Sequence, residues 1–192
     1  MRVSRKQAAA TRERIVEVAG ALFRAKGFNG IGVADIMKAA DLTHGGFYGH
    51  FGCKDDLSVE ASRWALAASA TRWRGIVAEA GDKPYPALLE HYLSSRHRDD
   101  PAHGCALSAL GTDAARGSAA LRGAFAEGLQ RLLDILTDAL PGFSKPARRR
   151  KAVAAMATMV GAVTLARAVD DPALSEEILD AARQELRSAA YR

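Results

Sequence analysis

Residues 32–51, GVADIMKAADLTHGGFYGHF, decide the fold because they describe two short helices separated by a tight turn. Apolar residues recur at helical spacing over residues 33–39 and predict a short helix with one buried face. After the turn at residues 40–42, Thr43 is suited to cap a helix that runs to about His50. Two helices joined in this way predict a helix-turn-helix unit, whose second helix enters the major groove of DNA.

The second helix of this unit is rich in glycine. Gly45, Gly46 and Gly49 lie within it, and each glycine costs a helix about 1 kcal/mol relative to alanine. Close approach of the backbone to phosphates or base edges would offset that cost, because glycine has no side chain to clash. Phe47 and Phe51 are four residues apart and can anchor the helix inward. Four side chains are then left outside to bond DNA, namely Thr43, His44, Tyr48 and His50.

The segments on either side fit the same unit. A helix predicted from about residue 8 to residue 26 ends at Gly27, a residue type that commonly follows a helix. Lys54 begins a long helix that runs to about residue 80, and a lysine beside a helix N-terminus offers phosphate both a charge and free N–H groups. Residues 1–7 are expected to form a mobile basic arm.

The distribution of charge supports a nucleic-acid partner. The net charge of the chain is +5, and residues 1–54 carry all of it, with nine Lys and Arg against four Asp and Glu. Residues 55–192 hold 18 residues of each sign. This asymmetry favours a polyanion at one end of the chain and argues against a highly charged ligand at the other. Chance clustering of charge on a solvated surface is the alternative.

Composition predicts an all-α protein. The chain has 192 residues, 48% of them hydrophobic, and lacks the alternating pattern of strands. Nine helices are expected, over residues 8–26, 33–39, 43–50, 54–80, 85–98, 105–115, 119–140 and 147–169, with a last one capped by Ser175; Ser144 is suited to start the eighth. No apolar run approaches the roughly 20 residues of a membrane span, and the polar N-terminus does not resemble a signal peptide. With only two cysteines, a cytoplasmic location without disulfides is predicted.

Residues 11–57 resemble the DNA-binding domain of the TetR family. The likeness rests on A-x-x-LF-x-x-x-GF at 19–28, I-x-x-AADLTHGGFYGHF at 36–51 and KDDL at 54–57. It implies a helix-turn-helix domain over residues 8–53 and a ligand-binding and dimerisation domain over 54–192. The positions it implies for DNA contact are Arg14, Gly32, Thr43, His44, Gly45, Gly46, Tyr48, His50 and Lys54. Gly32 replaces the usual Ser or Thr cap, and His44 replaces a common lysine.

Beyond residue 57 the resemblance is architectural, with closer likeness at residues 104–107, GCAL. It implies a largely apolar cavity for a small-molecule effector, for which the candidates are Trp64, Tyr92, His103, Cys105, Phe125, Met156 and Met159. It also implies a two-fold dimer formed by the last two helices, with Ala152, Met156, Met159, Val163, Ile178, Ala182 and Leu186 as interface candidates. The alternative is that these residues are simply core.

The resemblance implies a transcriptional regulator, a repressor released from an inverted-repeat operator by its effector. An enzyme is disfavoured, because the chain contains none of the sequences H-E-x-x-H, G-x-S-x-G, G-x-x-x-x-G-K or C-x-x-C. The five histidines are scattered, so no metal site and no cofactor are expected. A helical ligand-binding or interaction protein without specific DNA binding is the remaining alternative. Cys105 is a candidate redox sensor, although a buried structural thiol is favoured.

Overall fold

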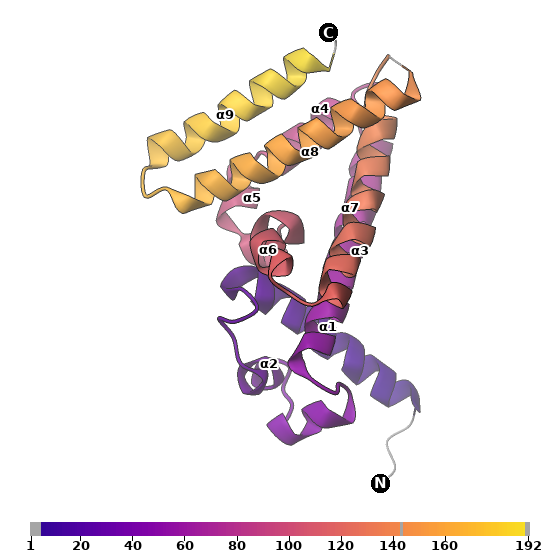
Figure 1. Ribbon diagram of the computed structural model, residues 1–192, viewed down its shortest axis with the longest axis vertical. Coiled ribbons are helices and arrows are strands. Elements are labelled where there is room, and N and C mark those ends of the chain that lie inside the picture. Colours follow the sequence, from indigo (N-terminus) through magenta and orange to yellow (C-terminus); the bar gives the residue numbers. More distant parts are fainter. Residues whose placement is uncertain (1–4, 143, 191–192) are drawn as a thin grey trace.

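The computed structural model describes residues 5–142 and 144–190, and every regular element within them is a helix (Figure 1). The predicted all-α class is confirmed. The elements in chain order are α1 (Arg5–Lys26), α2 (Val33–Ala39), the 3₁₀ helix η1 (His44–Gly49), α3 (Lys54–Glu79), α4 (Pro84–Tyr92), α5 (Ser95–Asp99), the 3₁₀ helix η2 (Pro101–His103), α6 (Ala106–Ala115), α7 (Ala119–Ala139), α8 (Lys145–Ala168) and α9 (Pro172–Ala189).

The N-terminal helices form a small unit at the foot of the molecule (Figure 1). Its centre is fully buried at Ile15, Phe23 and Ile36, residues that share the inward faces of α1 and α2. Gly27 follows α1 with φ of +76°, and its N–H donates to the Phe23 carbonyl at 2.7 Å. The predicted stop after α1 is therefore confirmed, because this left-handed conformation favours glycine. Of the predicted basic arm, residues 1–4 lie outside the described residues, and residues 5–7 form the first turn of α1.

Helices α3 and α7 run side by side as a column above this unit, and α8 and α9 lie across its upper end (Figure 1). The two helices are tightly packed where Leu66 of α3 meets Gly128 of α7, a contact that we call the notch. A Cβ placed on Gly128 of α7 would lie 2.7 Å from Cβ and 2.9 Å from Cγ of Leu66 on α3. Leu66 is fully buried there. The missing side chain of Gly128 is therefore what allows the two helices to approach this closely.

Helix α8 is the one helix of the described residues that is long and apolar enough to cross a membrane. That measure contradicts the prediction that no segment of the chain approaches a membrane span. The helix packs against α6, α7 and α9, and residues such as Met159 and Val163 on it are fully buried. A core helix of a soluble protein passes the same test of length and composition.

Two helix predictions were wrong in detail. The expected α-helix over 43–50 is the 3₁₀ helix η1, as its glycine content makes understandable, since glycine weakens an α-helix. The expected helix over 85–98 is interrupted after Tyr92, where Ser94 caps the separate helix α5 by accepting from the His97 N–H. Nine α-helices result in the described part of the chain, but not the same nine.

The predicted caps also failed. Neither Thr43 nor Ser144 forms a side-chain cap bond. Helix α9 begins at Pro172, and its cap is Asp171, whose carboxylate accepts from the N–H groups of Ala173 and Leu174. The helix therefore starts about one turn earlier than a cap at Ser175 would have placed it. Ser175 lies inside the helix and donates to the Ala166 carbonyl at 2.7 Å. Proline suits the first position of a helix, where its missing N–H costs nothing.

Replacing Gly128 with alanine is expected to destabilise the protein by about 1–3 kcal/mol, because Cβ and Cγ of Leu66 cannot both move aside without shifting α3. The matched control is Gly123→Ala in the same helix, where a Cβ meets nothing within 4 Å. There the better helix propensity of alanine should stabilise the protein by up to about 1 kcal/mol. Urea unfolding of the two variants measures both effects, and equal stabilisation by both would show that the notch is not tight.

Candidate functional site

The 3₁₀ helix η1 is anchored to the N-terminal unit by two phenylalanines. The rings of Phe47 and Phe51 stack with centroids 5.6 Å apart, and both are buried. The guanidinium of Arg12 on α1 lies 4.4 Å from the centre of the Phe51 ring and also pairs with Glu60 on α3. These contacts tie η1 to α1 and α3, so the predicted inward anchoring is confirmed.

The opposite side of η1 is exposed, as the sequence predicted. Tyr48 keeps 67% of its surface and packs edge to face with His44, and Thr43 is also exposed. A Cβ at Gly45 or Gly49 would meet nothing within 4 Å, and neither residue has a positive φ. Nothing in the described protein therefore requires glycine at these positions. A partner approaching from outside gives a reason for it, because it would gain contact with the bare backbone.

The other predicted DNA-contacting residues lie on neighbouring elements. Arg14 on α1 is exposed and lies 3.6 Å from the carboxylate of Asp41 in the turn before η1. Gly32 precedes α2 and makes no side-chain cap, as expected for its missing hydroxyl. Lys54 is the first residue of α3 and is half-buried, as is His50. A Cβ added to Gly46 would lie 3.7 Å from the Met37 side chain, whereas one added to Gly45 would meet nothing within 4 Å, so Gly46 lies nearer the interior.

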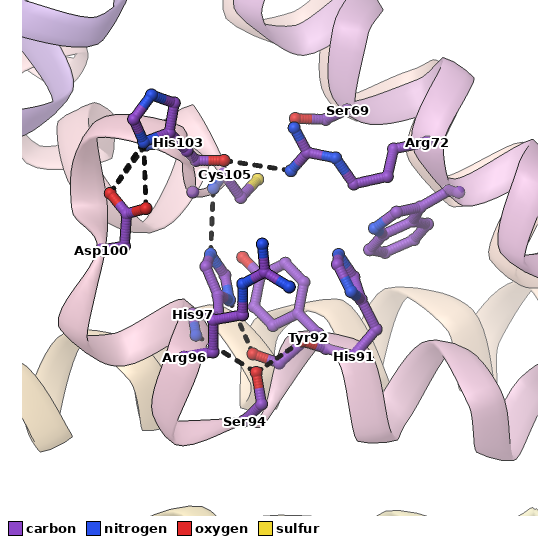
Figure 2. Close-up of a pocket in the computed structure, with 12 residues that line it drawn as sticks. Ser69, Arg72, His91, Tyr92, Ser94, Arg96, His97, Asp100, His103 and Cys105 are labelled. Carbon is purple, nitrogen blue, oxygen red and sulfur yellow. Dashed lines mark hydrogen bonds and ion pairs between the residues drawn. The ribbon is translucent and has the colours of Figure 1, made fainter.

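A cavity of about 430 Å³ opens higher in the molecule, between α3, α4 and the segment that contains α5 and η2 (Figure 2). Its lining is far more polar than the apolar cavity the sequence led us to expect. The described residues that line it are Ser69, Arg72, Trp73, His91, Tyr92, Ser94, Arg96, His97, Asp100, His103, Gly104 and Cys105.

His97 connects two sides of this cavity through hydrogen bonds at both of its ring nitrogens. Its Nδ1 lies 2.6 Å from the Tyr92 carbonyl, to which it donates, and its Nε2 lies 2.9 Å from the Cys105 backbone N, from which it accepts. A ring nitrogen that accepts a hydrogen bond cannot carry a proton, so this arrangement holds the imidazole neutral. Burial accordingly lowers the pKa of His97 to about 4. A Cβ on Gly104 would lie 2.8 Å from the same ring, which explains the glycine of the GCAL sequence.

Two arginines from different helices hold η2, which forms one side of the cavity. Arg24 on α1 is buried and donates from Nε to the Ala102 carbonyl at 2.7 Å. Arg72 on α3 donates from Nη1 to the His103 carbonyl at 3.0 Å (Figure 2). Burial lowers the pKa of Arg24 to about 10, and one of its nitrogens, Nη1, has no hydrogen-bond partner. The N-terminal unit and the cavity therefore share η2 as a common support.

The cavity includes some of the residues that the sequence put forward. Tyr92, His103 and Cys105 line it. Trp64 lies instead against Gly20 of α1, and Phe125 and Met159 are buried in the core. Met156 lines a separate apolar hollow of about 300 Å³ between α6, α7 and α8. Burial raises the pKa of the Cys105 thiol, which disfavours the reactive thiolate that a redox sensor needs.

Sequence reasoning missed the charged residues of the cavity. Arg72 lies on the long helix α3, where one more arginine gave no signal. Arg96 and His97 belong to the run RHR at residues 96–98, which was taken as the end of a continuous helix. The cluster of basic residues in that run was the one available hint. In the described residues, no group of three or more His, Cys, Asp or Glu side chains is placed to hold a metal ion.

The structure places most of the predicted dimer residues inside the protomer. Five of the seven are buried, namely Ala152, Met156, Met159, Val163 and Leu186. Ile178 and Ala182 are partly buried and pack against the same core. A buried side chain cannot reach a partner surface, so these five residues lie on the core side of α8 and α9. The outward face of α8 carries Val153 and Leu165, which remain 47% and 57% exposed.

Comparison with protein families identifies both halves of the chain. A family model described as bacterial regulatory proteins, tetR family, matches residues 15–61. A second model, described as the C-terminal domain of LmrA/YxaF-like transcriptional regulators, matches residues 86–185, which is just over half of the chain. The first match contains most of the N-terminal unit formed by α1, α2 and η1, which we call the reading unit. The second contains most of the cavity lining, all of α8 and most of α9.

Individual relatives agree with these matches. The uncharacterized HTH-type transcriptional regulator YerO of Bacillus subtilis (strain 168) is 26% identical over 92 residues, which cover 48% of this chain and 32% of YerO. The HTH-type transcriptional regulator AcrR of Shigella flexneri is 38% identical over 68 residues, which cover 35% of this chain and 31% of AcrR. The chain thus spans about a third of the length of the curated relatives it matches.

Solved structures share the whole architecture. A TetR transcriptional regulator from Chloroflexus aurantiacus superposes with a TM-score of 0.80 at 24% identity, covering 97% of each chain. The reduced form of NemR from E. coli superposes with a TM-score of 0.77 at 21% identity, covering 93% of this chain and 96% of NemR. At these identities the likeness shows the common fold alone.

Because His97 is neutral in the folded protein, the free energy of unfolding is expected to decrease as the pH is lowered. Its pKa of about 4 in the folded protein lies below the ordinary value near 6.5, so the unfolded chain binds a proton that the folded chain refuses. Stability present at pH 7 is therefore lost as pH falls from 6.5 towards 4, by about 2 kcal/mol at pH 5. Urea unfolding at pH 7 and pH 5 should show a smaller loss in His97→Gln than in the wild type. The exposed His44, replaced by glutamine, should leave the loss unchanged; an unchanged loss in His97→Gln would contradict the assignment.

Proposed function

Because the chain belongs to the TetR family of transcriptional regulators, we propose that it binds operator DNA through η1 and releases that DNA when a small molecule enters the cavity. Repression is the mode typical of the family. A regulator of this kind is soluble, and we place it in the cytoplasm, where its DNA is. The family is one of regulators rather than enzymes.

The observation that carries this proposal is the exposed face of η1. It presents Tyr48 and His44 to solvent beside two glycines whose positions are open, on an element that Phe47 and Phe51 fix from behind. Hydroxyl and imidazole groups can bond base edges and phosphates, and the bare backbone permits close approach. The surplus of positive charge in residues 1–54 supplies the attraction for a phosphate backbone.

The predicted contacts can be tested with DNA selected by the protein from a random pool. Affinity for the selected duplex should fall steeply between about 50 and 200 mM salt, because binding releases counterions. Tyr48→Ala should weaken binding about tenfold or more without changing thermal stability, since the side chain is exposed. Lys54→Ala should lower the salt slope by about 0.9 for each phosphate contact removed.

Lys83→Ala is the matched control for this charge, because Lys83 is an exposed lysine beside the N-terminus of α4, within residues 55–192, which carry no net charge. It should leave both affinity and slope as in the wild type. A protein that shifts no duplex at low salt would instead favour the second candidate function, a helical ligand-binding protein without specific DNA binding. The cavity, with its buried His97 and Tyr92, is the observation that keeps this candidate open.

We also propose that the protein acts as a homodimer formed by α8 and α9. The outward face of α8 carries Val153, Ala157, Gly161 and Leu165 at helical spacing, so small residues alternate with exposed apolar ones. Leu174 on α9 is 42% exposed and extends the apolar surface. A two-fold pair of such faces would present two η1 elements to half-sites about 34–36 Å apart on an inverted repeat.

Leu165→Glu should break this dimer, because a carboxylate would be buried against the partner without a counter-charge. Sedimentation should then show a monomer at micromolar concentration, with operator affinity lost as well. Met159→Leu changes a fully buried residue of the same helix and should leave the dimer intact. A wild-type chain that is already monomeric, or a Leu165→Glu variant that stays dimeric, would place the interface elsewhere.

A further inference from the structure

The described lining of the cavity carries two arginines, Arg72 and Arg96, against a single acidic residue. Figure 2 shows Arg72 and Arg96 extending into it from facing walls, and in the part of the chain described neither forms an ion pair with a carboxylate. Asp100 is the one acidic residue among the described lining. Its carboxylate accepts from Nδ1 of His103 at 2.9 Å and from the His103 backbone N–H at 3.3 Å, so its oxygens are already engaged.

The histidines of the lining do not change this balance. His97 is held neutral by the bonds it makes at both ring nitrogens. The pKa of His91 is lowered by burial and then by the positive charges of Arg72 and Arg96, so the field of both arginines reaches the wall of the cavity. The site therefore offers two guanidinium groups to whatever enters it.

Part of the lining is aromatic. Trp73 and Tyr92 pack edge to face with ring centroids 5.9 Å apart, and Tyr92 packs in the same way on His97 at 4.5 Å. A volume of about 430 Å³ lies within the range of small-molecule sites. A flat ring with one charged end matches this combination of an aromatic wall and two forked donors, because guanidinium groups bind carboxylates in the plane of both.

We propose that the cavity binds a small aromatic carboxylate, with its ring on the Trp73–Tyr92 wall and its carboxylate held by Arg72 and Arg96. The proposal rests on the proposed function, since this ligand would be the effector. Binding draws Arg72 away from the His103 carbonyl and removes one of the two arginine bonds that hold η2. The other bond comes from Arg24 of α1, so the ligand acts on the support that the reading unit shares with the cavity.

Other ligand classes fit less well. An organic cation would be repelled by both arginines. A neutral apolar molecule would be better received by the hollow beside Met156, whose described lining is Leu, Val, Ala and Met throughout. A metal ion finds no set of three suitable side chains among the described residues.

The test compares probes that differ only in charge. Calorimetry on the full chain without DNA would measure binding of 1-naphthoate and of 1-naphthamide, which keeps the rings but has no charge. Benzoate and indole-3-acetate extend the carboxylate set. Naphthoate should bind at least about tenfold more tightly than naphthamide. Arg72→Gln and Arg96→Gln should each weaken naphthoate binding by about tenfold and leave naphthamide binding nearly unchanged.

Arg74→Gln is the matched control, because Arg74 is an exposed arginine of α3 that does not line the cavity. It should bind naphthoate as the wild type does. Equal affinity for naphthoate and naphthamide, or no binding of any of the three carboxylates at millimolar concentration, would overturn the proposal. These comparisons use wild-type protein, so they hold even if a variant fails to fold.

A second measurement separates this proposal from the function it rests on. Naphthoate should lower the affinity of the wild type for its selected duplex, and Arg72→Gln should have lost that response. A protein that binds DNA but binds none of the three carboxylates would contradict the ligand assignment and leave the proposed function as a regulator intact. Binding of carboxylate by a protein that ignores DNA would do the reverse.

Discussion

The seat of Leu66 against Gly128 is the contact on which both candidate sites depend. Helix α3 is a single helix of 26 residues that begins at Lys54 beside η1 and carries Arg72 in the cavity wall. Leu66 lies near its middle and fills the space that the missing side chain of Gly128 leaves. Protein interiors are close-packed, so α3 cannot slide along α7 without leaving this notch. The two sites are thus carried by one helix, which is seated against α7 at Leu66.

The reading unit was largely predictable because its signals are local. The spacing of Phe47 and Phe51 fixed which side of η1 faces inward, and Gly27 marked the end of α1 by a backbone requirement that few other residues meet. What failed was the helix type and the caps. Residues 44–49 form a 3₁₀ helix rather than an α-helix, as their three glycines make understandable, and Asp171 displaced Ser175 as a cap because Pro172 starts the helix earlier.

The cavity could not be predicted to the same degree, because its walls come from separate parts of the chain. Arg72 and Arg96 are 24 positions apart, and only the break between α4 and α5 turns the second towards the first. The zero net charge of residues 55–192 concealed this local excess. Charge balance over a domain averages many exposed pairs, such as Arg63 with Glu127, that have no bearing on the field inside one hollow. Most of the predicted dimer residues proved to be buried for a related reason, since a stripe of small residues does not tell which side of α8 meets the core.

The position of the notch also determines how a ligand can act at a distance. Lys54 lies 12 residues from Leu66, about 18 Å along the helix, and Arg72 lies six residues away on the other side, about 9 Å. A rigid helix that pivots at Leu66 therefore doubles at Lys54 any sideways shift at Arg72, and a shift of about 2 Å is enough to lose a hydrogen bond to phosphate. A ligand favours the pivoted state only through a difference in affinity between the two states. Filling the cavity equally well in both would change nothing. In the mechanism that we propose, the effector therefore competes with the His103 carbonyl for Arg72, which a carboxylate can do and a neutral ring cannot.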